Sequence, residues 1–236
     1  MELLTKSPPY VSRPPRDEDQ DTAIARQAVY EAFNAVPIGM IITDENARIL
    51  HLNRTAEDLV QQGRGLVIHN GMLSAKTKSD ATRLRQTIGD VVSEARLGRG
   101  ARPRALPLHR FAEMHPLSIV IKPMWCPDGG DPRKRIGPLA NLIVADPDRR
   151  MEAPADLLRP FFDLTPAESV VLEQLVHGLT LQEIADTSGT SRNTVRNQLH
   201  IVFEKTGTSR QSELIKLVLS TAVWAYGEAR GPAGTC

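Results

Sequence analysis

The chain has only two cysteines among its 236 residues, and they stand far apart. Cys126 and Cys236 do not have the spacing of metal ligands, and so few cysteines are typical of a protein of the reducing cytosol. No apolar run approaches the roughly 20 residues that a helix needs to cross a bilayer, and the N-terminus lacks the apolar segment of a signal peptide. We therefore expect a cytoplasmic protein with no membrane contact.

The sequence also lacks the residue groups that carry catalysis or bind common cofactors. No acid–base pair, nucleophile triad, metal cluster or phosphate loop can be recognised. The Asn-Cys-Arg signature of flavin attachment is absent, and none of the histidines considered as haem ligands has supporting context: His51, His69, His109 and His115. We therefore expect no enzyme, no metal and no identifiable cofactor, and ordinary structural or surface roles for these histidines.

The chain has no overall excess of charge, because 29 basic and 28 acidic residues leave a net charge of +1. The distribution is uneven towards the C-terminus, however. Residues 161–190 contain no lysine or arginine, whereas residues 191–216 contain several: Arg192, Arg196, Lys205, Arg210 and Lys216. Positive charge gathered on one stretch of a neutral chain is typical of a surface that contacts phosphates.

Local start and stop signals divide this C-terminal region into short helices. Residues 165–168 and 180–183 are capping boxes, each with Thr at its first and Glu at its fourth position, and each predicts a helix start. Residues 188–190 form a glycine-containing turn, and Ser191 can cap a third helix that runs to about residue 205.

The predicted third helix has two different faces. An apolar stripe occurs at helical spacing and should pack on the two preceding helices: Val195, Leu199, Val202 and Phe203. The opposite side is polar: Asn193, Arg196, Asn197, His200 and Glu204. Two helices joined by a short turn, the second with a free polar face, match the helix-turn-helix unit that reads DNA.

The segment resembles the LuxR/GerE-type helix-turn-helix family of bacterial transcription regulators. The matching residues are Leu164-Thr165, Glu168, Leu172, Gly178, Glu183-Ile184-Ala185, Ser191, Thr194-Val195-Arg196, Leu199, Phe203, Lys205, Gly207, Arg210 and Glu213-Leu214. The resemblance implies an all-α domain of four helices in which Arg196, Asn197 and His200 face base edges in the major groove. Gln182 and Gln198 depart from the family, which commonly has Lys and His there.

Residue chemistry suggests the individual contacts. Arg196 suits guanine O6 and N7 or a phosphate, Asn197 suits adenine N6 and N7, and His200 can donate to guanine or phosphate. Contacts with the DNA backbone are expected from six further residues: Ser191, Arg192, Thr194, Gln198, Lys205 and Arg210.

Residues 210–226 predict a fourth helix, capped by Ser209, with apolar residues on more than one stripe. Two explanations remain open: this helix packs against the rest of the chain, or it forms a dimer contact. The resemblance favours a homodimer on double-stranded DNA, with an inverted repeat whose half-sites lie about one helical turn apart. RNA polymerase is a further partner that such a regulator can have.

The remaining sequence predicts a multi-domain protein. Residues 1–22 are rich in proline and charge and predict a flexible arm, whereas the proline-containing residues 149–160 predict a linker. Residues 23–148 then form a first domain, residues 161–226 the DNA-binding domain, and residues 227–236 a tail.

Periodicity within the first domain predicts helices and strands in the order β-β-helices-β-β-β. After a helix that ends near residue 36, the predicted elements are strands at 38–43 and 48–52, a helix capped by Asn53, a longer helix at 79–97, and strands at about 105–110, 117–123 and 139–146. This order predicts an antiparallel sheet with helices, an α+β domain. The short turn after Asp44 favours a hairpin over a phosphorylated receiver domain. Cys126 is expected in an exposed loop.

Residues 37–60 resemble the opening of a PAS domain. The matching residues are Gly39, Asp44, Ile49, Asn53 and Ala56. The resemblance implies an unknown small-molecule ligand or pairing with another PAS domain. We therefore expect a sequence-specific transcription regulator whose PAS-like domain senses a signal or controls dimerisation. The alternative is a PAS-like domain that serves as a ligand-free protein-interaction platform.

Overall fold

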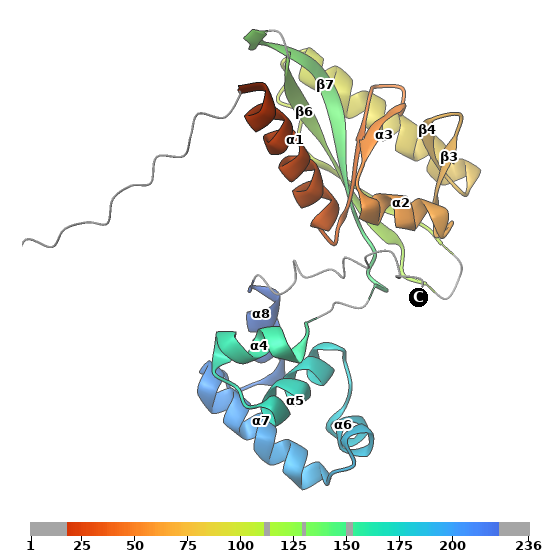
Figure 1. Ribbon diagram of the computed structural model, residues 1–236. Helices are drawn as coiled ribbons and strands as arrows, with labels where there is room; N and C mark the ends of the chain where they lie inside the picture. Colours follow the sequence, from red (N-terminus) through yellow and green to blue (C-terminus); the bar gives the residue numbers. More distant parts are fainter. Residues whose placement is uncertain (1–17, 111–113, 129–130, 150–152, 222–236) are drawn as a thin grey trace, which may run out of the picture. The chain divides into compact units, whose positions relative to one another are not determined.

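The computed structural model describes residues 18–110, 114–128, 131–149 and 153–221 (Figure 1). Helix α1, Glu18–Ala35, belongs to a separate compact unit that ends at Asn34. The predicted helix is therefore present, but it begins inside the predicted arm at residues 1–22.

Five antiparallel strands form the sheet of the PAS-like domain: β1 (Gly39–Thr43), β2 (Ile49–Leu52), β5 (Arg104–Leu108), β6 (Leu117–Asp128) and β7 (Asp131–Ala145). Their order across the sheet is β2-β1-β7-β6-β5. The first strand thus pairs with the last, with Ile41 opposite Leu142. The predicted antiparallel α+β architecture is confirmed. Because β1 pairs with β7, the first and last strands of the sheet lie next to each other inside it.

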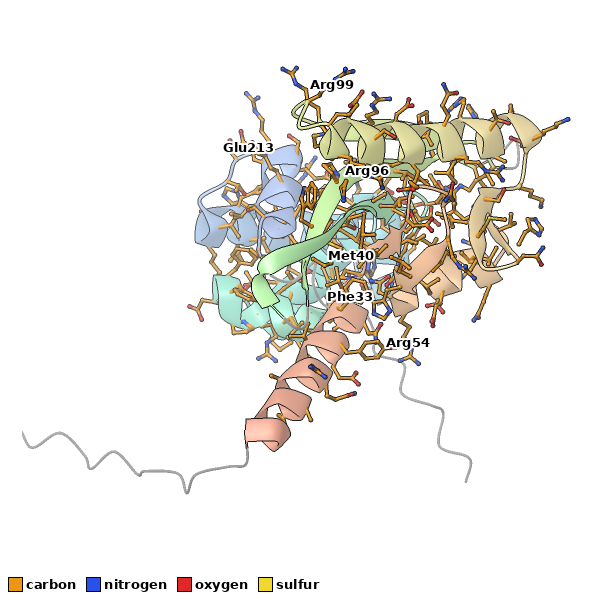
Figure 2. All side chains as sticks on the ribbon, turned by 90° about the horizontal axis from the view of Figure 1, so that it is seen from above. Phe33, Met40, Arg54, Arg96, Arg99 and Glu213 are labelled. Carbon is orange, nitrogen blue, oxygen red and sulfur yellow. The ribbon has the colours of Figure 1, made fainter. Side chains whose placement is uncertain are left out.

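Helices α2 (Arg54–Gln61) and α3 (Lys78–Arg96) contact this sheet, α2 at β1 and α3 at β5, β6 and β7 (Figure 1). Alternate strand residues meet the apolar side of α3 in one core: Ile41, Ile119, Ile121, Leu142 and Val144 with Leu84, Ile88, Val91 and Val92. Arg96, labelled in Figure 2, lies at the end of α3. It pairs with Glu45 of the β1–β2 turn. The predicted long helix and its buried face are confirmed.

A small hairpin between α2 and α3 was missed by the sequence prediction. Strands β3 (Leu66–His69) and β4 (Met72–Ala75) pair antiparallel through a turn at Asn70-Gly71. Both turn residues have positive φ, 52° and 74°, as tight hairpin turns require. The Asn-Gly dipeptide between two apolar runs is the signal that could have found it.

Asn53 fastens α2 to β1. Its Oδ1 accepts hydrogen bonds from the N–H groups of Met40, at 2.8 Å, and Ala56, at 3.0 Å. Its Nδ2 donates to the carbonyl oxygen of Ile38 at 2.9 Å, and the residue is fully buried. The predicted helix cap is confirmed, and one amide side chain also sets the position of the helix against the sheet.

The prediction of an exposed loop around Cys126 is wrong for the described residues. Trp125 and Cys126 lie within β6, and Cys126 is half-buried opposite Ile136 of β7. Pro127 follows Cys126 directly, and proline cannot donate to a strand ladder. Register shifts lie between Met124 and Cys126 and after Pro127, and with them the hairpin continues beyond the predicted strand end.

Five helices form the C-terminal domain: α4 (Ala155–Phe162), α5 (Pro166–Val176), α6 (Leu181–Ser188), α7 (Arg192–Thr206) and α8 (Gln211–Leu219). The predicted all-α architecture is confirmed. Helix α4 lies in the predicted linker at residues 149–160, yet Leu158 and Ala153 are buried in the core of this domain. A helix of two turns is stable only through such packing, which local sequence signals do not reveal.

Candidate nucleic-acid interface

The turn between α6 and α7 is determined by one glycine and one serine. Gly189 has left-handed backbone angles, φ 62° and ψ 31°, and the following Thr190 N–H donates to the carbonyl oxygen of Ala185 at 3.0 Å. Ser191 then caps α7, its Oγ accepting from the Thr194 N–H at 3.1 Å. The direction of α7 relative to α6 therefore depends on a backbone conformation that glycine adopts without strain.

Substitution of Ser191 separates its capping role from contact with DNA. Ser191→Ala should lower the free energy of unfolding by about 1 kcal/mol, because the Thr194 N–H loses its acceptor. Ser191→Asp keeps an acceptor, so stability should be close to that of the parent while DNA binding weakens through repulsion of phosphates. Urea unfolding and fluorescence anisotropy with labelled duplex DNA measure the two effects. Parent-like DNA binding by Ser191→Asp would remove Ser191 from the interface.

Helix α7 buries one side and leaves the other free. Val195, Leu199 and Val202 are at most 7% exposed and belong to the same core as Leu172 of α5 and Ile184 of α6. The opposite side is exposed: Asn193, Arg196, Asn197, His200 and Glu204. This division agrees with the two faces predicted from the sequence.

The candidate base-contacting residues differ in whether their side chains already have a partner within the protein. Within the part of the chain that the structure describes, the side chains of Arg196 and Asn197 are exposed and make no hydrogen bond or ion pair. His200 is 74% exposed, and its Nε2 lies 3.4 Å from Oε1 of Glu204, one turn further along. Arg196 and Asn197 can thus make contacts without first breaking others, whereas Glu204 competes for His200.

Lys205 makes contacts within the domain that the sequence did not predict. Its Nζ donates to Oε2 of Glu168 and to the carbonyl oxygen of Asp163, both at 2.8 Å. These bonds use two of the three N–H groups of the ammonium, so the predicted contact with the DNA backbone stays a prediction. The distances in sequence, 37 and 42 residues, explain why local pattern could not reveal these partners. Lys205 connects α7 to the start of α5.

Glu168 is the centre of this connection. It is 6% exposed, and its Oε2 also accepts from the Thr165 N–H at 2.8 Å as part of a capping box. Burial alone would raise the pKa of Glu168. Hydrogen bonds from Lys205 and from Thr165 outweigh this effect, and the pKa lies below its ordinary value of 4.5. The carboxylate is therefore stabilised in its charged form.

The other candidate contacts with the DNA backbone lie at the ends of helices, except Gln198 in the middle of α7. Arg192 and Thr194 are exposed in the first turn of α7, and Gln198 is half-buried. Arg210, not Ser209, is the N-cap of α8. The N–H and Oγ of Ser209 instead donate to Oε2 of Glu213, each at 3.1 Å. Arg210 is exposed and its guanidinium makes no capping bond, so it is free to meet an anion.

Comparison with known protein families identifies both folded regions. Residues 163–218 match the bacterial regulatory proteins of the luxR family, and residues 27–91 match the PAS domain family. No curated protein sequence matches the chain significantly. None of the helices in the described residues has the length and apolar character required to cross a bilayer.

Solved structures with related architecture share little sequence with the chain. The phage VqmA–DPO complex is 21% identical, with a TM-score of 0.36 over 88% of this chain and 93% of that one. The Vibrio cholerae VqmA–ligand–DNA complex is 16% identical, with a TM-score of 0.34 over 84% and 88%. The PAS domain of Bordetella pertussis BvgS is 17% identical, with a TM-score of 0.31 over 59% and 96%. At these values only the two sequence-family matches identify the domains.

Proposed function

We propose that this chain, in which a PAS domain at residues 27–91 precedes a luxR-family DNA-binding domain at residues 163–218, is a sequence-specific transcription regulator controlled by a signal. The family comprises regulatory proteins and not enzymes. The observation that carries sequence specificity is the pair Arg196 and Asn197, exposed and without partners among the described residues, on a helix whose other side is buried. Such side chains can be matched to base edges in the major groove.

The proposed contacts divide into two groups. Arg196, Asn197 and His200 contact base edges and determine sequence choice. Contacts with the phosphate backbone come from residues at helix starts and at the edge of α7: Ser191, Arg192, Thr194, Gln198 and Arg210. Lys205 belongs to the same group through its third N–H, since the other two bind Glu168 and Asp163.

Useful affinity requires two copies of the domain. Residues 161–236 carry six basic and eight acidic residues, so a single copy gains little from attraction to phosphates. Helix α8 buries Leu214 and Val218 in the core but leaves Leu219 42% exposed. We therefore assign a homodimer, with α8 or the PAS domain as the contact, and an inverted repeat as its DNA site.

Selection of duplexes from a random double-stranded DNA library by the full-length protein tests this function. The expected outcome is an inverted repeat with half-sites about 10 base pairs apart, centre to centre. Light scattering should give the mass of two chains. Recovery of duplexes without a common sequence would contradict the proposal.

An observation in the PAS domain favours a ligand over a ligand-free platform. The Oγ1 of Thr43 is buried and has no hydrogen-bond partner, and the residue is fully buried on β1 beside an apolar core. An unsatisfied buried hydroxyl costs about 1–3 kcal/mol, which a bound polar group would recover. Native mass spectrometry of gently purified protein should show a bound small molecule that Thr43→Val retains poorly. Equal occupancy in both proteins would argue against this assignment.

Gln182 offers a test of phosphate proximity by gain of function. Its Nε2 donates to Oδ1 of Asp186 at 2.8 Å, on the exposed side of α6. Gln182→Lys should strengthen binding to all duplexes a few-fold. The slope of log affinity against log salt concentration should become steeper by about one, because each new phosphate contact releases about one counterion. Gln62→Lys, in the PAS domain, adds the same charge and is the matched control. Equal effects of the two variants would contradict a position of α6 close to the phosphates of bound DNA.

A further inference from the structure

One large aliphatic side chain lies on the otherwise polar outer side of α7. Ile201 is 39% exposed, whereas the other aliphatic residues of this helix are buried: Val195, Leu199 and Val202. Ile201 is therefore not needed to close the core of the domain. The exposed part of the Ile201 side chain would gain free energy if a partner removed its apolar area from water.

Helix geometry places Ile201 inside the proposed base-contacting surface. Successive residues of an α-helix are rotated by about 100°, and the buried residues define the inward direction. Asn197 then points almost directly outward, and His200 and Ile201 flank it on opposite sides, each roughly 50° from that direction. Arg196 lies further round than either. Ile201 is also only about 1.5 Å beyond His200 along the axis.

The surroundings of Ile201 limit the kind of partner. Its exposed helical neighbours are polar or charged: Asn197, Lys205 and, beside them, His200 and Glu204. One aliphatic side chain among such residues offers too little apolar area for a protein interface, which needs several hundred square ångströms from each partner. Within the major groove, the 5-methyl group of thymine is the apolar feature that base edges present.

We propose that Ile201 is a specificity-determining residue that contacts a thymine 5-methyl group beside the base read by Asn197. This inference rests on the proposed DNA-binding function. Ile201 would add a preference for thymine at one position of each half-site. Polar contacts alone would leave that position less restricted.

Replacement of single thymines by deoxyuridine tests the contact, because uracil differs from thymine only in lacking the methyl group. The probe is the duplex selected by the full-length parent from the random library, with each thymine replaced in turn. At one thymine per half-site, the parent should lose affinity about fourfold, the value for one buried methyl group. Ile201→Ala should bind the thymine duplex more weakly but show no further loss on the uracil duplex. Ile201→Val should keep part of the sensitivity.

The outcomes separate this inference from the proposed function. A parent that binds its selected duplex specifically, yet equally well after every uracil substitution, would overturn the inference and leave the function standing. Full uracil sensitivity in Ile201→Ala would overturn it too, since another residue would then contact the methyl group. Failure of the parent to select any sequence would overturn both. Because Ile201 is exposed, parent-like thermal unfolding of Ile201→Ala is expected, and Ile201→Thr provides a second variant with a polar side chain.

Discussion

Glu168→Gln is expected to lower the free energy of unfolding of the C-terminal domain by about 2–4 kcal/mol. The substitution removes the negative charge next to Lys205 and leaves one neutral amide oxygen to accept from both the ammonium and the Thr165 N–H. Loss of one partner from a fully buried ion pair costs about 3–5 kcal/mol, and the value here is smaller because the Lys205 side chain is 30% exposed. The same contact joins α7 to the start of α5, so α7 should become less stable as well.

Glu183→Gln provides the matched control. Glu183 occupies the same place in the second capping box, where its Oε2 accepts from the Thr180 N–H at 2.7 Å, but it is exposed and is not paired with a cation. Its substitution should have a much smaller effect. Urea unfolding of the full chain, combined with hydrogen exchange of the α7 amides, measures both variants. Equal destabilisation by the two substitutions would show that the contact with Lys205 contributes little.

The pH dependence of stability should report the same group. The folded-state pKa of Glu168 lies below its ordinary value of 4.5, so the folded state holds the proton less tightly than the unfolded state. The stabilisation is therefore fully present above that ordinary value and is lost as pH falls below it, through the folded-state pKa. Glu168→Gln should flatten the acid limb of the stability profile. An unchanged acid limb would contradict the assignment.

Arg196→Ala is expected to weaken binding to the selected duplex by about 1–3 kcal/mol, roughly 5- to 150-fold. Arg196 is exposed and without a partner among the described residues, so its removal should leave the fold intact. If its guanidinium is bidentate to guanine O6 and N7, discrimination at that base pair should relax while binding to unrelated DNA changes little. Fluorescence anisotropy with the selected duplex and with single-base variants gives both quantities.

Arg192→Ala is the control on the same helix, four residues earlier. A phosphate contact at Arg192 predicts weaker binding to every duplex and a salt slope reduced by about one, with no change in base preference. If base preference changed in Arg192→Ala and not in Arg196→Ala, then Arg192 would be the base contact and Arg196 the phosphate contact. If Arg196→Ala, Asn197→Ala and His200→Ala all bound the selected duplex like the parent, the proposed set of base contacts would be wrong.

The sequence by itself determined the features that depend on a few neighbouring residues. Capping boxes at Thr165 and Thr180, the glycine turn at Gly189 and the Ser191 cap involve groups three to five positions apart, so the starts of α5, α6 and α7 follow from local chemistry. The two faces of α7 follow from helical spacing alone. The hydrogen bonds of Asp44 that form the β1–β2 turn are equally local, from the N–H groups of Asn46 and Arg48.

Only the tertiary structure decided the features that join distant residues. The pairing of β1 with β7, the burial of Leu158 by the C-terminal core and the contact of Lys205 with Glu168 each connect residues that no local pattern relates. Lys205 shows the physical reason most clearly. A lysine near the end of a DNA-contacting helix has the same local sequence whether it faces a phosphate or a carboxylate. The choice depends on which group the folded chain brings within hydrogen-bonding distance of its Nζ.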